Sequence, residues 1–231
     1  MDFFEAVERR RSIRKFKDEN VPEEVMHKAI DAALLAPNSS NMQTWDFYWL
    51  HSPESKAKVI PLCLSQSAAR QAKEFLVVVA NPDLWKRAQI PLLKWVREIK
   101  APSLVVTYYE KLIPFTYRAG FLNTFAPFKW LISSCIGLFR PMTRGPNFLG
   151  SLQEVAIKSA ALAAENFVLA ISAQGFSTCM MEGFDEFRVK RMLKLPYRAR
   201  VVMIIAVGRE SERGTWGPRF RLPKEEVVHI L

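Results

Sequence analysis

Cysteine and histidine are scarce in this sequence, and the few that occur are widely spaced. The 231 residues include three cysteines and three histidines, with no C-x-x-C and no H-x-x-x-H pair. We therefore expect neither a disulfide framework nor a zinc site, and a reducing cytoplasm is the natural compartment. A catalytic imidazole or a histidine-based metal centre is not expected either.

Two further features are missing. The N-terminus is charged from Asp2 and has no apolar segment of the signal-peptide kind, so we expect no secretory signal. No G-x-G-x-x-G follows an expected strand, which argues against a dedicated Rossmann-type dinucleotide site.

Acidic residues are outnumbered by basic ones. The chain has 33 Lys and Arg against 23 Asp and Glu, a formal net charge of +10. Such an excess favours an anionic partner. The partner could be a phosphorylated ligand, nucleic acid or an acidic membrane surface, and charge alone does not choose among them.

The patterning predicts a single domain in which helices and strands are mixed. Helices are expected at 22–36, 151–174 and 186–195, and strands at 45–50, 75–80, 176–181 and 201–208. The small residues of 151–174 would let another helix approach closely, and the polar tail from Ser211 is expected to form an arm. Since no regular βαβ repeat is present, the fold class is α+β.

The segment 111–150 is unusual because it is aromatic and basic and contains no acid. Its aromatic residues are Phe115, Tyr117, Phe121, Phe125, Phe128, Trp130, Phe139 and Phe148, and its cations are Lys111, Arg118, Lys129, Arg140 and Arg144. The longest uncharged run is shorter than the roughly 20 residues that span a bilayer. The segment fits a lid or dimer element over a flat ligand, or a patch on anionic lipid. We favour the lid because aromatic segments of soluble enzymes more often face a pocket or core.

Five cations surround one hydroxyl at 9–16, R-R-R-S-I-R-K-F. Clustered like charges repel, and a guanidinium fork fits a phosphate to which a serine hydroxyl can also donate. Most short basic runs are a solvated basic face or a nucleic-acid arm, and the run by itself favours that interpretation over a phosphate site.

Four segments in order resemble the nitroreductase family of flavoenzymes. R-R-S-I-R-K-F at 10–16 resembles its R-R-S-x-R-x-F signature, and A-P-N-S-S-N-M-Q-T-W at 36–45 its A-P-S-x-x-N-x-Q-P-W loop. G-F-S-T-C-M-M-E-G-F-D at 175–185, with L-K-L-P at 193–196, is similar to its G-x-G-T-C-W-x-G-G-F-D…L-G-L-P block. A basic pair before P-K-E-E-V at 223–227 completes the pattern, which covers about 1–80 and 150–231 but not 81–149.

The resemblance implies a nitroreductase-like α+β fold, with a central mixed sheet flanked by helices, in an intertwined homodimer that holds FMN at its interface. It further implies ping-pong hydride transfer from NADH or NADPH, through flavin N5, to an electron-poor acceptor such as a nitroaromatic or quinone. The flavin carries the chemistry, so no side chain is assigned a catalytic role.

The resemblance also implies where FMN is held. The phosphate would be bound by Arg10, Ser12, Arg14, Arg219 and Arg221, with Arg11 in the same stretch. Arg9 and Lys15 are expected to be solvated charges. The second subunit would present a polar loop to the ring, through Ser39, Ser40, Asn41 and Gln43. The Glu182–Gly183 backbone would lie near N5, and Gln66 would contact the ribityl chain.

The sequence departs from the family pattern at Asn38, Thr44 and 180–183, and the segment 111–150 is unlike that of a typical member. Cys179 is interpreted as a small buried residue. Two alternatives remain: the same flavin reducing a halogenated or lipid-like substrate, or a non-enzymatic basic module that binds a membrane or nucleic acid. The oxidoreductase hypothesis includes no nucleic-acid partner, and it limits membrane contact to 111–150.

Overall fold

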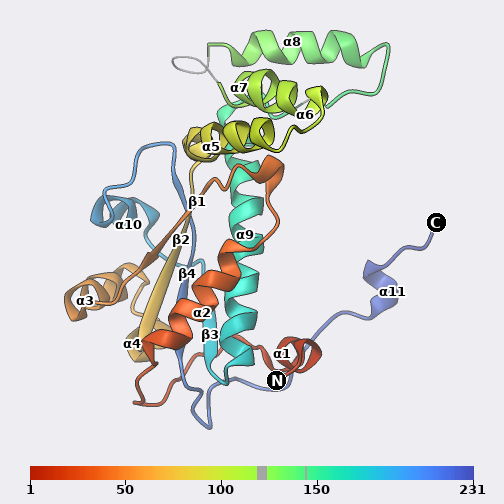
Figure 1. Cartoon of the computed structure of the whole chain (residues 1–231). Helices are drawn as coiled ribbons and strands as arrows, with labels where there is room; N and C mark the ends of the chain where they lie inside the picture. The colour runs from red at the N-terminus through yellow and green to blue at the C-terminus, as the bar shows by residue number, and fades with distance from the viewer. Residues whose placement is uncertain (119–123, 144) are drawn as a thin grey trace.

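The computed structural model describes residues 1–118, 124–143 and 145–231 (Figure 1). Phe121 and Arg144, both considered above, lie outside the described residues.

A four-stranded sheet forms the centre of the molecule. Its strands are β1 (Trp45–Trp49), β2 (Glu74–Ala80), β3 (Ser177–Met181) and β4 (Arg200–Gly208), in the order β1-β2-β4-β3. All four lie where the sequence predicts strands, so the α+β class is confirmed. The expected sheet is mixed, whereas the four strands of the structure pair antiparallel throughout. The parallel pairing in the described part of the chain is an isolated bridge between Ser12 and Thr178.

The antiparallel arrangement follows from the connections. The segment after β1 contains α3 (Pro53–Leu62) and α4 (Ser67–Gln71), and β2 then starts opposite the end of β1. Likewise α10 (Glu186–Met192) returns the chain so that β4 runs back along β3. Helical connections thus serve here as long turns between antiparallel strands rather than as crossovers between parallel ones.

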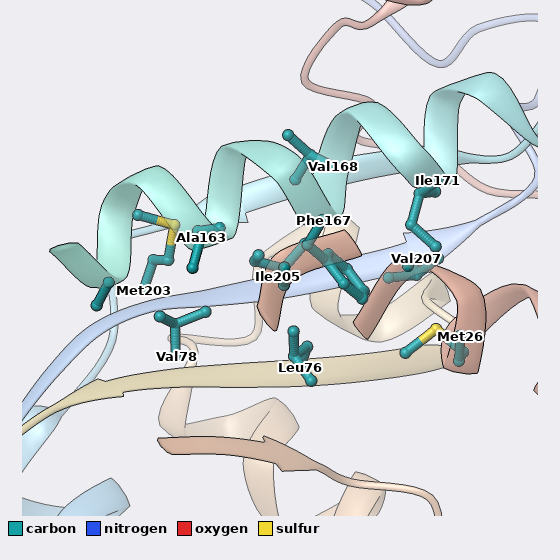
Figure 2. Packing of buried hydrophobic residues seen from close by; sticks show 14 of the residues in the cluster. Met26, Leu76, Val78, Ala163, Phe167, Val168, Ile171, Met203, Ile205 and Val207 are labelled. Carbon is teal, nitrogen blue, oxygen red and sulfur yellow. The ribbon is translucent and has the colours of Figure 1, made fainter. Parts of the chain in front are cut away.

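One face of the sheet is covered by α9 (Leu149–Ala173) and α2 (Glu23–Leu34). Figure 2 shows Phe167 of α9 lying over Leu76 and Ile205 of the sheet, with Met26 of α2 beside it. The predicted close approach of a second helix is confirmed, since α2 packs where α9 presents buried alanines, namely Ala156, Ala160, Ala163 and Ala164. By length and composition α9 could cross a membrane, but half of its apolar stretch is buried inside the protein. It is therefore weak support for a membrane span.

The remaining helices gather at the two ends of α9. Near its start lie α5 (Trp85–Glu98), α6 (Ser103–Thr107), a π-helix η3 (Tyr108–Leu112), α7 (Ile113–Tyr117) and α8 (Ala126–Gly137) (Figure 1). Near its other end lies α1 (Phe3–Arg9). The C-terminal tail projects from the body with the short helix α11 (Lys224–Val227), and every residue from Trp216 onward is exposed. The predicted arm is confirmed.

Candidate functional site

The basic run and the C-terminal tail meet in a cavity of about 390 Å³, which we call the basic cavity. Its lining consists of Arg10, Arg11, Ser12 and Arg14 from the run, and 215–221 from the tail, including Arg219 and Arg221. The run is held in place by its backbone: Ile13 donates to the carbonyl of Thr178 at 2.9 Å, and Arg14 to that of Gly214 at 2.8 Å. Because Ile13 and Phe16 are buried, the backbone of the run is anchored on both sides of Arg14, beside the tail residue Gly214.

The arginines of the basic cavity are bonded mainly to backbone carbonyls. Arg219 donates to the carbonyls of Glu8 and Arg10, and Arg11 donates to that of Gly217. Among the residues that the structure describes, Arg10 is the arginine of this cavity that forms an ion pair. Its partner is Glu165, and the distance from Arg10 Nε to Glu165 Oε1 is long, at 3.9 Å. Five guanidinium groups therefore face one cavity largely without neutralising carboxylates. Their mutual repulsion is relieved when an anion shares their charge.

Trp216 is a part of the basic cavity that the sequence did not indicate. Its indole ring lies under the Arg14 guanidinium, 4.3 Å from the ring centroid to Cζ. This cation–π contact orients Arg14 at the cavity wall. The sequence does contain a signal for this role. Trp216 lies three residues before Arg219, in the turn-forming series T-W-G-P.

The two cations expected to be solvated behave differently. Lys15 is exposed, as expected. Arg9 is exposed too, but its Nη2 donates to the carbonyl of Gly175 at 2.9 Å. This carbonyl lies just beyond the C-terminal end of α9, where the helix dipole favours a cation. Arg9 thus has a structural partner that the local pattern could not reveal.

Gln66, Glu182 and Gly183 come together at the end of β3. Gln66 Nε2 donates to the carbonyls of Gly183 at 2.6 Å and Cys63 at 3.1 Å, while Glu182 and Gly183 are exposed. The same edge strand bridges Ser12 at Thr178, four residues before Glu182. A strand advances about 3.3 Å per residue, so the basic cavity and the Glu182–Gly183 turn lie about 13 Å apart along one sheet edge.

The polar loop at 38–43 satisfies part of its own backbone, as such turns do. Asn38 Oδ1 accepts from the backbone of Gln43 at 2.8 Å, and Asn41 Oδ1 accepts from Gln43 Nε2 at 3.4 Å. Ser40, Asn41 and Gln43 have positive φ angles. The hydroxyl of Ser40 pairs with that of Tyr108 in the π-helix, a residue the sequence had not marked.

Within one chain this loop does not reach the basic cavity. The backbone of Ser39 donates to Ser159 Oγ, ten residues into α9, whereas Ser172 Oγ, near the end of α9, donates to the carbonyl of Ala6 in α1. At 1.5 Å per residue these two points on α9 are about 20 Å apart. The loop and α1 accordingly lie well apart along α9, with α1 at the C-terminal end of the helix (Figure 1).

A second cavity, of about 350 Å³, opens beside Ser39 and Ser40 and is covered by α7 and α8. Burial raises the pKa of Tyr117 in its wall to about 12 and lowers the pKa of Lys129. Cys63 and Cys179, by contrast, are buried in the core, where burial raises the pKa of Cys63 to about 11. The interpretation of Cys179 as a small buried residue is confirmed.

Comparison with known families agrees with the motifs. The family model described as Nitroreductase family matches residues 7–209 of the chain. The chain belongs to the nitroreductase family. The matched span runs through 81–149, which the motif comparison left out, and it ends before Arg219 and Arg221.

Several relatives share most of this nitroreductase's length. A Thermus thermophilus protein named NADH dehydrogenase is 27% identical over 229 residues, 99% of this chain and 95% of the relative. A predicted NAD(P)H nitroreductase of Streptococcus pyogenes, Spy0809, is 26% identical over 229 residues, 99% of this chain and 98% of the relative. Among solved structures, a predicted nitroreductase from Exiguobacterium sibiricum in complex with FMN aligns with a TM-score of 0.73 and 21% identity, covering 100% of this chain and 98% of that one.

Proposed function

We propose that this protein is an FMN-dependent NAD(P)H oxidoreductase whose basic cavity binds the phosphate of FMN. The observation that carries the proposal is the donor set, five guanidinium groups and the Ser12 hydroxyl around one cavity. Charge-assisted, forked donors are the ligands that a phosphate dianion takes. The E. sibiricum neighbour, in complex with FMN, and the S. pyogenes relative, a predicted NAD(P)H nitroreductase, support this reading.

The ring of FMN would lie at the Glu182–Gly183 turn. This turn directly follows β3, and the first part of β3 forms a bridge with Ser12 at Thr178. The phosphate and the ring of FMN, which a five-carbon ribityl chain joins, could therefore both lie along the edge of β3. A Cβ at position 183 would lie 3.1 Å from Gln66 Nε2, so only glycine leaves room there without moving Gln66. The open backbone lets its amides approach the ring near N5, with Gln66 beside the ribityl chain.

The site is completed by a second copy of the chain. The loop with Ser39, Ser40, Asn41 and Gln43 contacts α9 about 20 Å along the helix from the point where α1 contacts it, so these residues would reach the ring of the partner's flavin. Exposed apolar side chains at Phe3 and Phe4 of α1, and along the C-terminal arm, supply surface for an intertwined homodimer. The homodimer would work in the cytoplasm, as the widely spaced free cysteines suggest.

Bound in this way, FMN supplies ping-pong hydride transfer from NADH or NADPH to an electron-poor acceptor such as a nitroaromatic or a quinone. The protein's residues bind and orient it. The alternative of a free nucleic-acid or membrane module loses its support, because Arg10, Arg11 and Arg14 line a cavity instead of forming a solvated face.

The test is the double variant Arg10→Ala, Arg14→Ala, with Lys15→Ala as the matched control for a neighbouring exposed cation. A hydrogen bond to a charged group is worth about 1.5–3 kcal/mol, so losing two should weaken FMN binding roughly 100-fold or more. Titration of the FMN-free proteins, followed by flavin fluorescence, measures the dissociation constants. Equal affinity in the double variant and the wild type would contradict the phosphate assignment. A wild-type protein that stays colourless after incubation with FMN would contradict the cofactor itself.

A further inference from the structure

The cavity beside Ser40 combines an apolar wall with a few buried polar groups. We call it the α7–α8 cavity. Its apolar lining includes Leu112, Ile113, Phe115, Ile132, Met142 and Val155, and its polar lining includes Ser40, Tyr108, Tyr117, Lys129 and Ser133. Small-molecule sites have this composition, in which apolar walls hold the body of a ligand and one or two polar groups orient it. The π-helix that carries Tyr108 is a further feature that is frequent at functional sites.

Among the residues that the structure describes, Lys129 is the charged group of this cavity, and it is 3% exposed. Its Nζ donates to the carbonyl of Thr116 at 2.9 Å and lies 6.0 Å from the centroid of the Phe115 ring. An ammonium group has three N–H donors. In the ranges 1–118, 124–143 and 145–231, Lys129 forms no ion pair with a carboxylate, and the nearby Glu110 is paired with Arg97 at 2.6 Å.

Such a lysine is costly to bury. A buried charge without a counter-ion destabilises the fold, and burial here lowers the pKa of Lys129. The other titratable groups that line the described part of the cavity, Tyr108 and Tyr117, are phenols and supply no negative charge at neutral pH. An anionic ligand would remove this cost by pairing with the ammonium group.

We propose that the α7–α8 cavity takes an electron-poor organic acceptor that carries a carboxylate, and that Lys129 binds this carboxylate. The inference rests on the proposed function, in which the loop at Ser39 and Ser40 reaches the flavin ring. Ser40 and Lys129 line the same cavity, so an acceptor held by Lys129 lies against that loop. In this assignment α8 acts as a lid over the acceptor, and the apolar walls favour an aromatic or acyl body.

The test compares two acceptors that differ in charge, para-nitrobenzoate and para-nitrobenzyl alcohol, with the FMN-loaded protein and NADH or NADPH. The wild type is expected to favour the anion in kcat/KM. Lys129→Met removes the charge, and Lys129→Gln removes it while leaving an N–H donor for the Thr116 carbonyl. Both should lower the ratio of kcat/KM, anion over neutral, about 10- to 100-fold, chiefly through KM, as expected for a lost charged hydrogen bond. Lys111→Met, an exposed lysine of the same region, is the matched control and should leave the ratio unchanged.

The outcomes separate the two proposals. If the wild type binds FMN and reduces the neutral acceptor but does not favour the anion, the carboxylate assignment is wrong. It is also wrong if Lys129→Gln keeps the wild-type ratio of kcat/KM, anion over neutral. In that case Lys129 would serve only to hydrogen-bond α8 to α7. Should Lys129→Met fail to fold, Lys129→Gln decides, and inhibition of the wild type by benzoate but not by benzyl alcohol is an independent measure. A protein that holds no FMN contradicts the proposed function instead.

Discussion

Gly208, at the end of β4, allows a sharp test of how the basic run is held. A Cβ built there would lie 2.8 Å from Phe16 Cδ1, 2.9 Å from Cγ and 3.1 Å from Cβ. The φ angle of Gly208 is not positive, so Gly208→Ala adds a methyl group without backbone strain, and the effect is steric. Phe16 is buried and cannot turn into solvent. Overpacking of this kind costs about 1–3 kcal/mol.

Displacing Phe16 should also disturb the basic cavity. Phe16 ends the run that carries Ser12 and Arg14, and its backbone donates to Gln71 Oε1 at 3.1 Å. For a chain of this size, 1 kcal/mol corresponds to a shift in melting temperature of about 2–4 °C. Gly208→Ala should therefore lower the melting temperature of the FMN-free protein by about 2–12 °C and weaken FMN binding.

Circular dichroism melts and flavin titration measure both effects. Gly150→Ala is the matched control, because a Cβ there meets nothing within 4 Å and alanine favours the helix. It should leave the melting temperature unchanged or raise it. Adding Phe16→Leu to Gly208→Ala should relieve the overlap, so the double variant should lose less stability than the two single losses together. A melting temperature of Gly208→Ala equal to that of the wild type, or strict additivity in the double variant, would refute the argument.

Two further predictions concern titratable groups. Cys135 is exposed while Cys63 and Cys179 are buried with raised pKa values, so an aromatic disulfide reagent at mild alkaline pH should label one thiol rapidly in the native protein. Cys135→Ser should abolish this phase, and rapid labelling of a second thiol would contradict the burial of the other two. Burial raises the pKa of Tyr117 from 10.0 to about 12, so the unfolded chain loses this proton first and stability should fall as pH rises from 10 to 12. Urea unfolding over this range should show a smaller fall for Tyr117→Phe, and equal slopes for the two proteins would contradict the effect of burial.

The comparisons give no support to membrane contact by 111–150, although Phe128, Trp130 and Phe139 of this segment are exposed. The segment forms part of the wall and cover of the α7–α8 cavity, with Lys129 turned inward instead of toward a lipid surface. An aromatic and basic composition is shared by lids and by lipid-binding patches. A lid turns such side chains toward a cavity, and a lipid-binding patch turns them toward solvent. The direction of each side chain cannot be read from a sequence in which the helix boundaries are unknown.

Local patterns determined the secondary structure of this protein. The apolar runs of β2 and β4 and the proline before α2 act within a few residues, so the four strands and the helices α2, α9 and α10 could be predicted. The ordered motifs determined the family and nominated the cations of the basic cavity.

Tertiary packing decided the rest. The pairing of Arg11 with Gly217, 206 residues away, and the contact of Trp216 with Arg14 depend on β3 fixing the run against the tail. Packing along α9 decided that the Ser39–Asn41 loop lies far from the basic cavity, and the cover of α7 and α8 decided that Lys129 is buried. Propensities and caps act over one or two turns of chain. Which distant segments share a cavity is set by the packing of the whole core, and for that reason only the folded structure could show it.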